Sequence, residues 1–292
     1  MQFFWKNKKI EKTSTLYTYI DTLEDLSILN KELIEKPFLG VDTEFRRTTK
    51  DNMKLALLQI NDGEEIYLID TVLIKKPEDN CKFLFSESVT KIFHSCKEDL
   101  EAIHSWTGEV MVNLFDTQLA NAFLDGDYSI GYQGLVQDKL GIKLDKKETR
   151  SNWIKRPLSE SQLNYAATDV EFLINIYLDQ KRELIESDKL DWHKEDLQLL
   201  ISSIFNSSEH FEEVSSILTK KAEKELLFKF NEIVIKLAYE NAIHPTLFFS
   251  KKSQKDFIRL ALCYGLKEAS EEISRWRRDL IQKPLEEILA DF

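Results

Sequence analysis

Strand-like segments in the first 120 residues are separated along the chain in two different ways, and this difference limits the possible folds. Three of them, within residues 38–70, come directly one after another, and Asn61-Asp62-Gly63 between the second and third is a strong hairpin signal. Further along, short apolar runs alternate with helical stretches, a pattern typical of strands added in parallel. With a short strand near residues 16–20, the sequence predicts an α/β fold around a mixed sheet whose three sequential strands are antiparallel.

Helical patterns separate and follow these strands. Apolar residues recur at helical spacing in residues 21–36, and helices are also predicted for residues 97–106 and 117–124. A longer helix is predicted from Ser159 to Ile185, because Ser159 with Gln162 three residues later has the form of a capping box. Beyond a boundary near residues 192–208 the pattern is helical only. This last part is small for an independent core, so we expect it to pack on the preceding domain or on a partner.

Two acidic residues lie in the first of the three sequential strands. Asp42 and Glu44 in GVDTEF are two positions apart, so a strand points both carboxylates to the same face. The neighbouring Val41 and Phe45 indicate a buried strand. Two carboxylates held together repel each other unless a cation lies between them. The segment therefore favours a metal site over a solvated acidic face.

Three residues of related chemistry follow later in the chain. Asp99 in HSCKEDLEAI lies in the first turn of a helix directly after a strand, a junction where ligands gather in α/β sheets. Tyr165 and Asp169 in LNYAATDVEFL are four positions apart and share one helix face, although this fragment alone fits a half-buried tyrosine and a solvated aspartate. Together the four carboxylates suit a small hard cation such as Mg²⁺. Two such ions about 4 Å apart can assist a displacement at phosphorus.

Charge and cysteine content narrow the class of protein. The net charge is −11; residues 1–200 hold 26 Lys and Arg against 36 Asp and Glu, and residues 201–292 hold 14 against 15. The acidic part is therefore the part with the carboxylates, whose charge divalent cations would offset, so RNA or DNA binding depends on local basic patches. Three cysteines without a CxxC pair favour free thiols in a reducing cytoplasm. No apolar run reaches about 18 residues, so no membrane helix and no membrane partner are expected.

Basic residues near the acidic motifs are candidates for phosphate contacts. Arg46 directly follows the first motif, and Lys147 and Arg150 precede the last one, in a stretch that also holds Lys143, Lys146, Lys155 and Arg156. A charged run is usually a solvated loop. Two basic clusters in the C-terminal part are weaker candidates for nucleic-acid binding: Lys251, Lys252, Lys255 and Arg259, and Arg275, Arg277 and Arg278. Phe45 fits equally well a residue that stacks on the last base and one that packs in the core.

In this order, three segments closely resemble ribonuclease D, of the tyrosine-bearing DEDD 3′–5′ exonucleases: VDTEF, HSCKEDLE and LDKKETRSNWIKRPLSESQLNYAATDVEFL. The resemblance covers about residues 16–184 and implies a ribonuclease H-like fold, a mixed five-stranded sheet flanked by helices. AYENAIHPTLFFSKKSQKDFIRLAL and WRRDLIQKPLEEIL resemble an HRDC domain, of which the family commonly has two and this chain has room for one. The implied division is a catalytic domain in residues 1–195, a linker or degenerate helical remnant in 196–222 and a small all-α HRDC-like domain in 223–292.

The resemblance also implies a role for each motif residue. Asp42, Glu44 and Asp169 would hold one divalent cation, Asp42 and Asp99 a second, either Mg²⁺ or Mn²⁺, and Tyr165 would orient the attacking water. The implied activity is removal of 5′-mononucleotides from RNA 3′ ends by two-metal hydrolysis, with tRNA precursors as substrates, as in tRNA 3′ maturation. Two alternatives stay open. One is a DNA-directed 3′–5′ exonuclease of the same superfamily, because no residue here reports on the 2′-OH; the other is a non-catalytic RNA-binding module.

Overall fold

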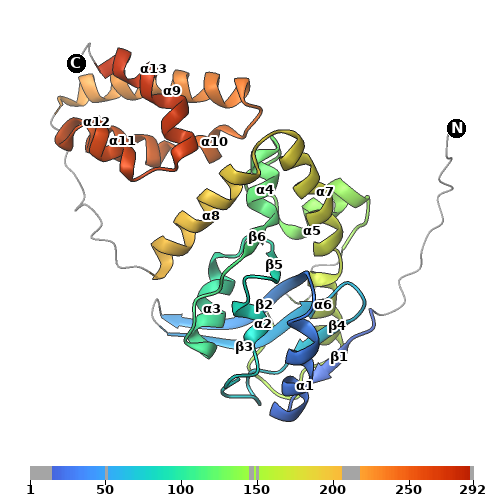
Figure 1. The fold of residues 1–292 in the computed structure, drawn as a ribbon. Helices are drawn as coiled ribbons and strands as arrows, with labels where there is room; N and C mark the ends of the chain where they lie inside the picture. The colour runs from blue at the N-terminus through green and yellow to red at the C-terminus, as the bar shows by residue number, and fades with distance from the viewer. Residues whose placement is uncertain (1–14, 50–51, 145–147, 149–150, 206–217, 290–292) are drawn as a thin grey trace, which may run out of the picture.

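The computed structural model describes residues 15–49, 52–144, 148, 151–205 and 218–289 (Figure 1). Within them one mixed sheet has the strand order β1-β4-β3-β2-β5-β6. β2, β3 and β4 are antiparallel neighbours, whereas β1, β5 and β6 join in parallel. The strands are β1 (Thr18–Ile20), β2 (Phe38–Thr49), β3 (Asn52–Asn61), β4 (Ile66–Ile69), β5 (Thr90–Phe93) and β6 (Leu114–Asp116). The predicted strand segments and both kinds of pairing are confirmed.

Helices cover both faces of this sheet. The pleat of β2 divides its side chains between the two layers: Leu39 and Val41 pack in the core beneath α1 and α3, whereas Gly40 faces α6 and α7. One layer consists of α1 (Leu23–Leu33), α2 (Lys82–Phe85) and α3 (Lys97–Thr107), and the other of α4 (Thr117–Phe123), α6 (Glu160–Glu171) and α7 (Leu173–Glu186). The predicted mixed sheet flanked by helices is confirmed, with six strands where the resemblance implied five.

The helix predicted from Ser159 to Ile185 is in fact two helices that meet at Phe172. The prediction of a single helix was wrong because the break depends on a distant residue: the Tyr132 hydroxyl accepts a hydrogen bond from the Phe172 N–H at 3.0 Å. Its predicted start is correct, since Ser159 and Gln162 form a capping box. The sequence pattern also missed α5 (Tyr132–Leu140), a short helix that buries only two side chains.

The C-terminal part is helical, as predicted. Phe230, Phe249 and Phe257 pack together in its core. Its helices are α9 (Lys220–Glu240), α10 (Pro245–Phe248), α11 (Lys251–Tyr264), α12 (Leu266–Glu271) and α13 (Arg275–Leu289). α8 (Leu190–Phe205) leads toward it and packs on β6 and α3, so residues 196–205 of the expected linker or helical remnant form packed helix. Residues 206–217 lie outside the described part, and the three-way division of the chain stays a prediction.

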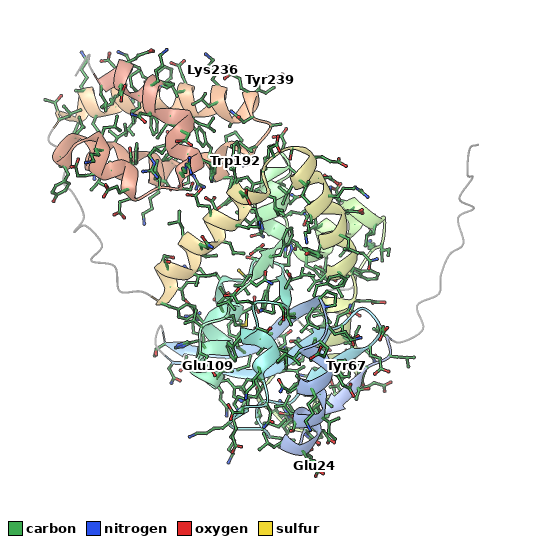
Figure 2. All side chains as sticks on the ribbon, viewed as in Figure 1. Glu24, Tyr67, Glu109, Trp192, Lys236 and Tyr239 are labelled. Atoms are coloured by element: carbon green, nitrogen blue, oxygen red, sulfur yellow. The ribbon has the colours of Figure 1, made fainter. Side chains whose placement is uncertain are left out.

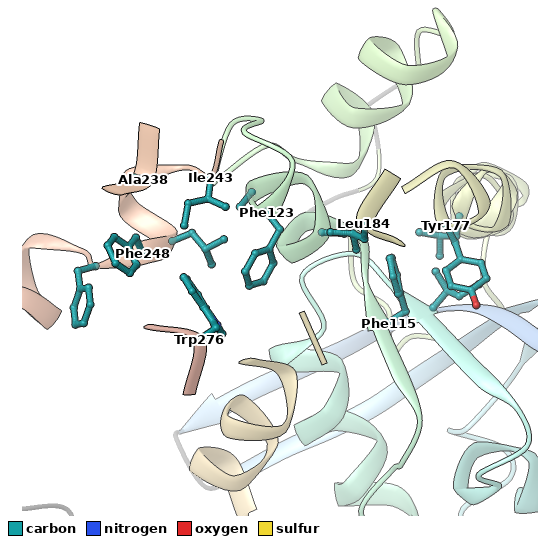
Figure 3. Close-up of a cluster of buried hydrophobic side chains, with 14 of the residues drawn as sticks. Phe115, Phe123, Tyr177, Leu184, Ala238, Ile243, Phe248 and Trp276 are labelled. Carbon is teal, nitrogen blue, oxygen red and sulfur yellow. The ribbon is translucent and has the colours of Figure 1, made fainter. Parts of the chain in front are cut away.

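One continuous hydrophobic cluster joins the two parts (Figure 3). Trp276 of α13 stacks on Trp192 of α8, with ring centres 4.9 Å apart, and contacts Phe123 of α4 at 5.4 Å. Trp192 lies at the junction in Figure 2. Asp196 accepts a hydrogen bond from the Trp276 indole N–H at 2.9 Å and pairs with two nitrogens of Arg277, at 2.5 and 2.7 Å. The C-terminal part therefore packs on the preceding domain, as expected.

Two further predictions can be compared with the described residues. None of the helices in these ranges is long and apolar enough to cross a bilayer. Cys81, Cys96 and Cys263 carry free thiols, as predicted.

The ion pair between the two parts gives the first testable prediction. Asp196→Ala should lower the free energy of unfolding by about 3–5 kcal/mol, because it leaves the largely buried Arg277 without its carboxylate. Urea unfolding followed by tryptophan fluorescence measures this loss. Asp179→Ala is the matched control: its pair with Arg182 is exposed, so the change should stay within about 0.5 kcal/mol. Equal losses in both variants would contradict the structural weight given to Asp196.

Candidate active site

β2 directs the first acidic pair toward the α6–α7 layer. Gly40, Asp42 and Glu44 alternate with Leu39 and Val41, and the position of Gly40 identifies the face. A methyl group at residue 40 would lie 3.2 Å from Leu173 Cβ, so β2 and α7 approach closely there. By the same alternation Asp42 and Glu44 face this layer.

Asp99 enters from the opposite layer. It lies in the first turn of α3 and is buried. Thr43, whose side chain alternates with those of Asp42 and Glu44, donates its hydroxyl hydrogen bond to Asp99 Oδ1. β2 therefore helps to position all three carboxylates: it carries Asp42 and Glu44 itself and holds Asp99 through the hydrogen bond from Thr43.

Asp116 fixes the turn from which α3 begins. Ser95 adopts a left-handed backbone with φ of 64°, and Asp116 accepts hydrogen bonds from the backbone N–H groups of Ser95 (3.1 Å) and Cys96 (2.8 Å). The same carboxylate caps α4 by accepting from the N–H groups of Gln118 and Leu119. One buried side chain thus sets the start of two helices, including the one that carries Asp99.

Tyr165 and Asp169 of α6 line a pocket of about 380 Å³ together with Asp42. The capping box at Ser159 fixes the start of this helix one and a half turns before Tyr165. The Trp153 ring, whose centre lies 6.1 Å from that of Tyr165, packs beside it. The structure therefore brings the last predicted motif against the first. The other lining residues are His94, Gly131, Tyr132, Gln133, Gly134 and Leu173.

The carboxylates act on one another electrostatically. Burial, and then the charges of the other three carboxylates, raises the pKa of Asp42 well above its usual range. Burial, followed by the charges of Asp169 and Asp99, raises the pKa of Glu44 to about 9. Burial raises the pKa of Asp99 to about 7, although the hydrogen bond from Thr43 lowers it. The four predicted acidic residues therefore share one electrostatic environment.

This donor set fits a hard divalent cation. All four side chains offer carboxylate oxygens, the ligands that Mg²⁺ and Mn²⁺ prefer, and a cation would relieve the repulsion that raises their pKa values. Among the described residues, no three His, Cys, Asp or Glu side chains stand already grouped around a common metal position. The fit thus rests on the chemistry and mutual charge of these residues.

None of the six other lining residues of the pocket was predicted as a site residue, and two of them, Tyr132 and His94, bond to the surrounding backbone. Tyr132 is partly buried and lines the pocket, donates its hydroxyl to the Thr168 carbonyl at 3.3 Å and accepts from the Phe172 N–H, so it holds the end of α6 in place. His94 follows β5 directly and contacts the Ile130 carbonyl through Nε2 at 2.9 Å. The one signal in sequence was the position of His94 at the carboxyl end of a parallel strand.

The structure gives little support to the predicted substrate contacts. Phe45 packs partly buried against the core beneath α3, which favours its packing role. Arg46 is exposed, and Lys147 and Arg150 lie outside the described residues. The prediction that Arg156 contacts phosphate was wrong, because this side chain pairs with the buried Asp70 and donates to the Ala56 carbonyl. Arg259 and Arg277 are likewise engaged by carboxylates, those of Glu223 and Asp196.

A model of the 3′–5′ exonuclease family matches residues 17–185, more than half of the 292-residue chain. The chain therefore belongs to the 3′–5′ exonuclease family. Ribonuclease D of Pseudomonas paraeruginosa is 40% identical to it over 179 residues, 61% of this chain and 47% of that protein. Ribonuclease D of Escherichia coli is 36% identical over 176 residues, 60% of this chain and 46% of that protein. The chain thus matches about half the length of these relatives, and the predicted resemblance to ribonuclease D is confirmed.

Solved structures share the fold. The crystal structure of Escherichia coli ribonuclease D, an exoribonuclease involved in structured RNA processing, has a TM-score of 0.60 at 24% identity, covering 95% of this chain and 75% of that one. Brucella melitensis NrnC with bound Mg²⁺ has a TM-score of 0.57 at 21% identity, covering 71% of this chain and all of that one. The chain therefore shares the arrangement of sheet and helices of these two solved structures.

The role of Asp116 leads to the second prediction. Asp116→Asn should destabilise the fold by about 1–3 kcal/mol, because its amide nitrogen replaces the oxygen Oδ2 and cannot accept the hydrogen bond from the Cys96 N–H. Thermal unfolding and faster amide exchange at Cys96 would measure this. Asp127→Asn, an exposed residue that accepts from Ser129, is the control and should change little. Unchanged exchange at Cys96 would argue against the proposed anchoring of α3.

Proposed function

We propose that the chain is a 3′–5′ exoribonuclease that removes 5′-mononucleotides from RNA 3′ ends. The observation that carries this proposal is the convergence of three distant segments: Asp42 on β2 and Asp169 on α6 line one pocket with Tyr165, and Asp99 raises the pKa of Asp42 from the other layer. Family membership and the ribonuclease D relatives support the reaction class and the RNA substrate.

The proposed cofactors are two divalent cations, Mg²⁺ or Mn²⁺. Asp42, Glu44 and Asp169 would hold one, and Asp42 with Asp99 the other, in keeping with the mutual charge effects among these residues. When bound, such ions neutralise the charge that develops on the attacking and leaving oxygens at phosphorus. NrnC, a protein of the same fold, has a structure with bound Mg²⁺, which agrees with this cofactor class.

The remaining steps fall to the side chains of the pocket. Tyr165 would hydrogen-bond the attacking water and aim it at the terminal phosphorus, while Trp153 keeps the ring in place. The pocket between α5 and α6 would receive the 3′-terminal nucleotide. The 3′ oxygen of the preceding nucleotide leaves with a proton from solvent, and the product is a 5′-monophosphate.

The natural substrate and the domain roles are further parts of the proposal. Precursors of tRNA with 3′ extensions are the proposed RNA, because ribonuclease D relatives match the catalytic region. Residues 1–195 would be the catalytic domain and residues 223–292 the HRDC-like domain, which would help to hold the RNA. Matched RNA and DNA oligonucleotides, digested side by side with Mg²⁺ or Mn²⁺, would separate this function from a DNA-directed exonuclease, for which faster DNA digestion is expected.

Replacement of the shared ligand gives the third prediction. Asp42→Asn should reduce digestion of a 3′-extended tRNA precursor by about 10³-fold or more, because the proposed ligand of both ions is lost. Its unfolding temperature in EDTA should stay unchanged or rise, since one of four repelling carboxylates becomes neutral.

The control is Glu98→Gln, which removes an exposed carboxylate one residue from Asp99 that pairs only at 3.6 Å with Arg47. It should keep close to full activity. Full activity of Asp42→Asn would refute the nuclease assignment. No Mg²⁺ or Mn²⁺ binding by the unmodified protein would favour the non-catalytic RNA-binding module.

The hydroxyl of Tyr165 is the subject of the fourth prediction. Tyr165→Phe keeps the ring beside Trp153 and removes only the oxygen, so kcat should fall about 10²-fold while KM changes little. Single-turnover digestion of a labelled RNA measures the step directly. Tyr128→Phe, at an exposed tyrosine that stacks on His244, should leave both constants unchanged. A purely structural tyrosine would instead give a less stable enzyme with normal kcat.

A further inference from the structure

Gln59 of β3 occupies an unusual place in the sheet. It stands directly opposite Asp42 in the antiparallel pairing of β2 with β3, and on its other side it faces Leu68 of β4. Residues paired in this way project from the same face of a sheet, with Cβ atoms about 4.5–5.5 Å apart. The Gln59 side chain therefore projects from the same face of the sheet as the Asp42 side chain and begins next to it.

Both polar atoms of this amide lack a hydrogen-bond partner. Gln59 is completely buried, and neither its nitrogen nor its oxygen has a partner among the described residues. Buried polar side chains are nearly always hydrogen-bonded, because an unmatched amide lowers the stability of the fold. A methionine or leucine would fill the same place without that cost, so packing alone does not explain a glutamine here.

The neighbouring residue on the same face shows what such an amide normally does. Asn61, two positions along β3, donates to the carbonyls of Val170 and Glu171 at 3.0 and 3.1 Å and accepts from the Gly63 N–H. Its hydrogen bonds attach the end of α6 to the sheet. Gln59 has no such structural task, although it lies between Asn61 and Leu57, which pairs with Glu44.

We propose that Gln59 is a positioning residue for Asp42, an inference that rests on the proposed function. Its amide N–H donates to the Asp42 carboxylate when that carboxylate takes up a divalent cation, and so fixes which oxygen faces the metal. Ligating carboxylates are commonly held by a hydrogen bond of this kind, and its loss costs about 10–100-fold in metal affinity. The unmatched amide of Gln59 then lowers the stability of the fold but serves the site.

Gln59→Met tests this inference, since methionine has a similar shape and no hydrogen-bonding amide. Without metal, the variant should unfold at the same or a higher temperature than the unmodified protein, because an unmatched buried amide is removed. Calorimetric titration with Mn²⁺ should show a dissociation constant raised about 10–100-fold. The kcat at low Mn²⁺ should fall and recover in part at high Mn²⁺.

A second buried glutamine is the matched control. Gln180 of α7 donates to the Thr117 carbonyl at 2.9 Å, so Gln180→Met should lower the unfolding temperature and leave Mn²⁺ affinity unchanged. Wild-type Mn²⁺ affinity in Gln59→Met would overturn the inference. If both Gln59→Met and Gln59→Leu fail to fold, the amide is structural and the inference is also overturned. Failure of the unmodified protein to bind Mn²⁺ would instead refute the proposed function itself.

Discussion

The antiparallel pairing of β2 with β3 is the constraint on which the rest of the site depends. Its pleat sends Asp42 and Glu44 toward α6 and Thr43 toward α3, so one strand contacts helices of both layers at the same level. A register shift of one residue would turn Asp42 and Glu44 into the apolar core beneath α3. It would also turn Val41 toward the layer of α6 and α7. The apolar row of Leu39 and Val41 therefore fixes the position of the carboxylates, because only one register buries it.

The fold supports this group of carboxylates at a cost. Burial and mutual repulsion raise the pKa values of Asp42 and Glu44, which means that their charged forms are destabilised in the folded chain. The surrounding structure offsets this with well-satisfied polar groups nearby. Asp116 accepts four backbone N–H groups, and Asn61 ties α6 to β3. Rigid supports of this kind allow a group of like charges to stay assembled.

The motif residues could be predicted from sequence because each lies on a regular element whose period is visible in the chain. Asp42 and Glu44 follow the strand period, and Tyr165 and Asp169 the helix period. The supporting residues could not, since their partners are distant in sequence. Tyr132 breaks the helix at Phe172 across 40 residues, and Arg156, read as a phosphate contact, is held by Asp70 across 86. The local sequence around a basic residue does not show whether that residue pairs with a buried carboxylate or contacts a phosphate.

The contact between the two parts of the chain also bears on how the C-terminal helices act. Lys189 donates to the carbonyls of Phe123 and Ala242, and the His244 N–H donates to the Ala122 carbonyl, so the C-terminal part holds the end of α4. Asp116 caps the other end of α4 and also fixes the start of α3. Removing the C-terminal helices would therefore expose Phe123 and release a helix whose cap supports Asp99. A truncated chain could therefore lose activity because its catalytic part is less stable, as well as through any loss of RNA contacts. Measuring folding together with turnover distinguishes these two causes.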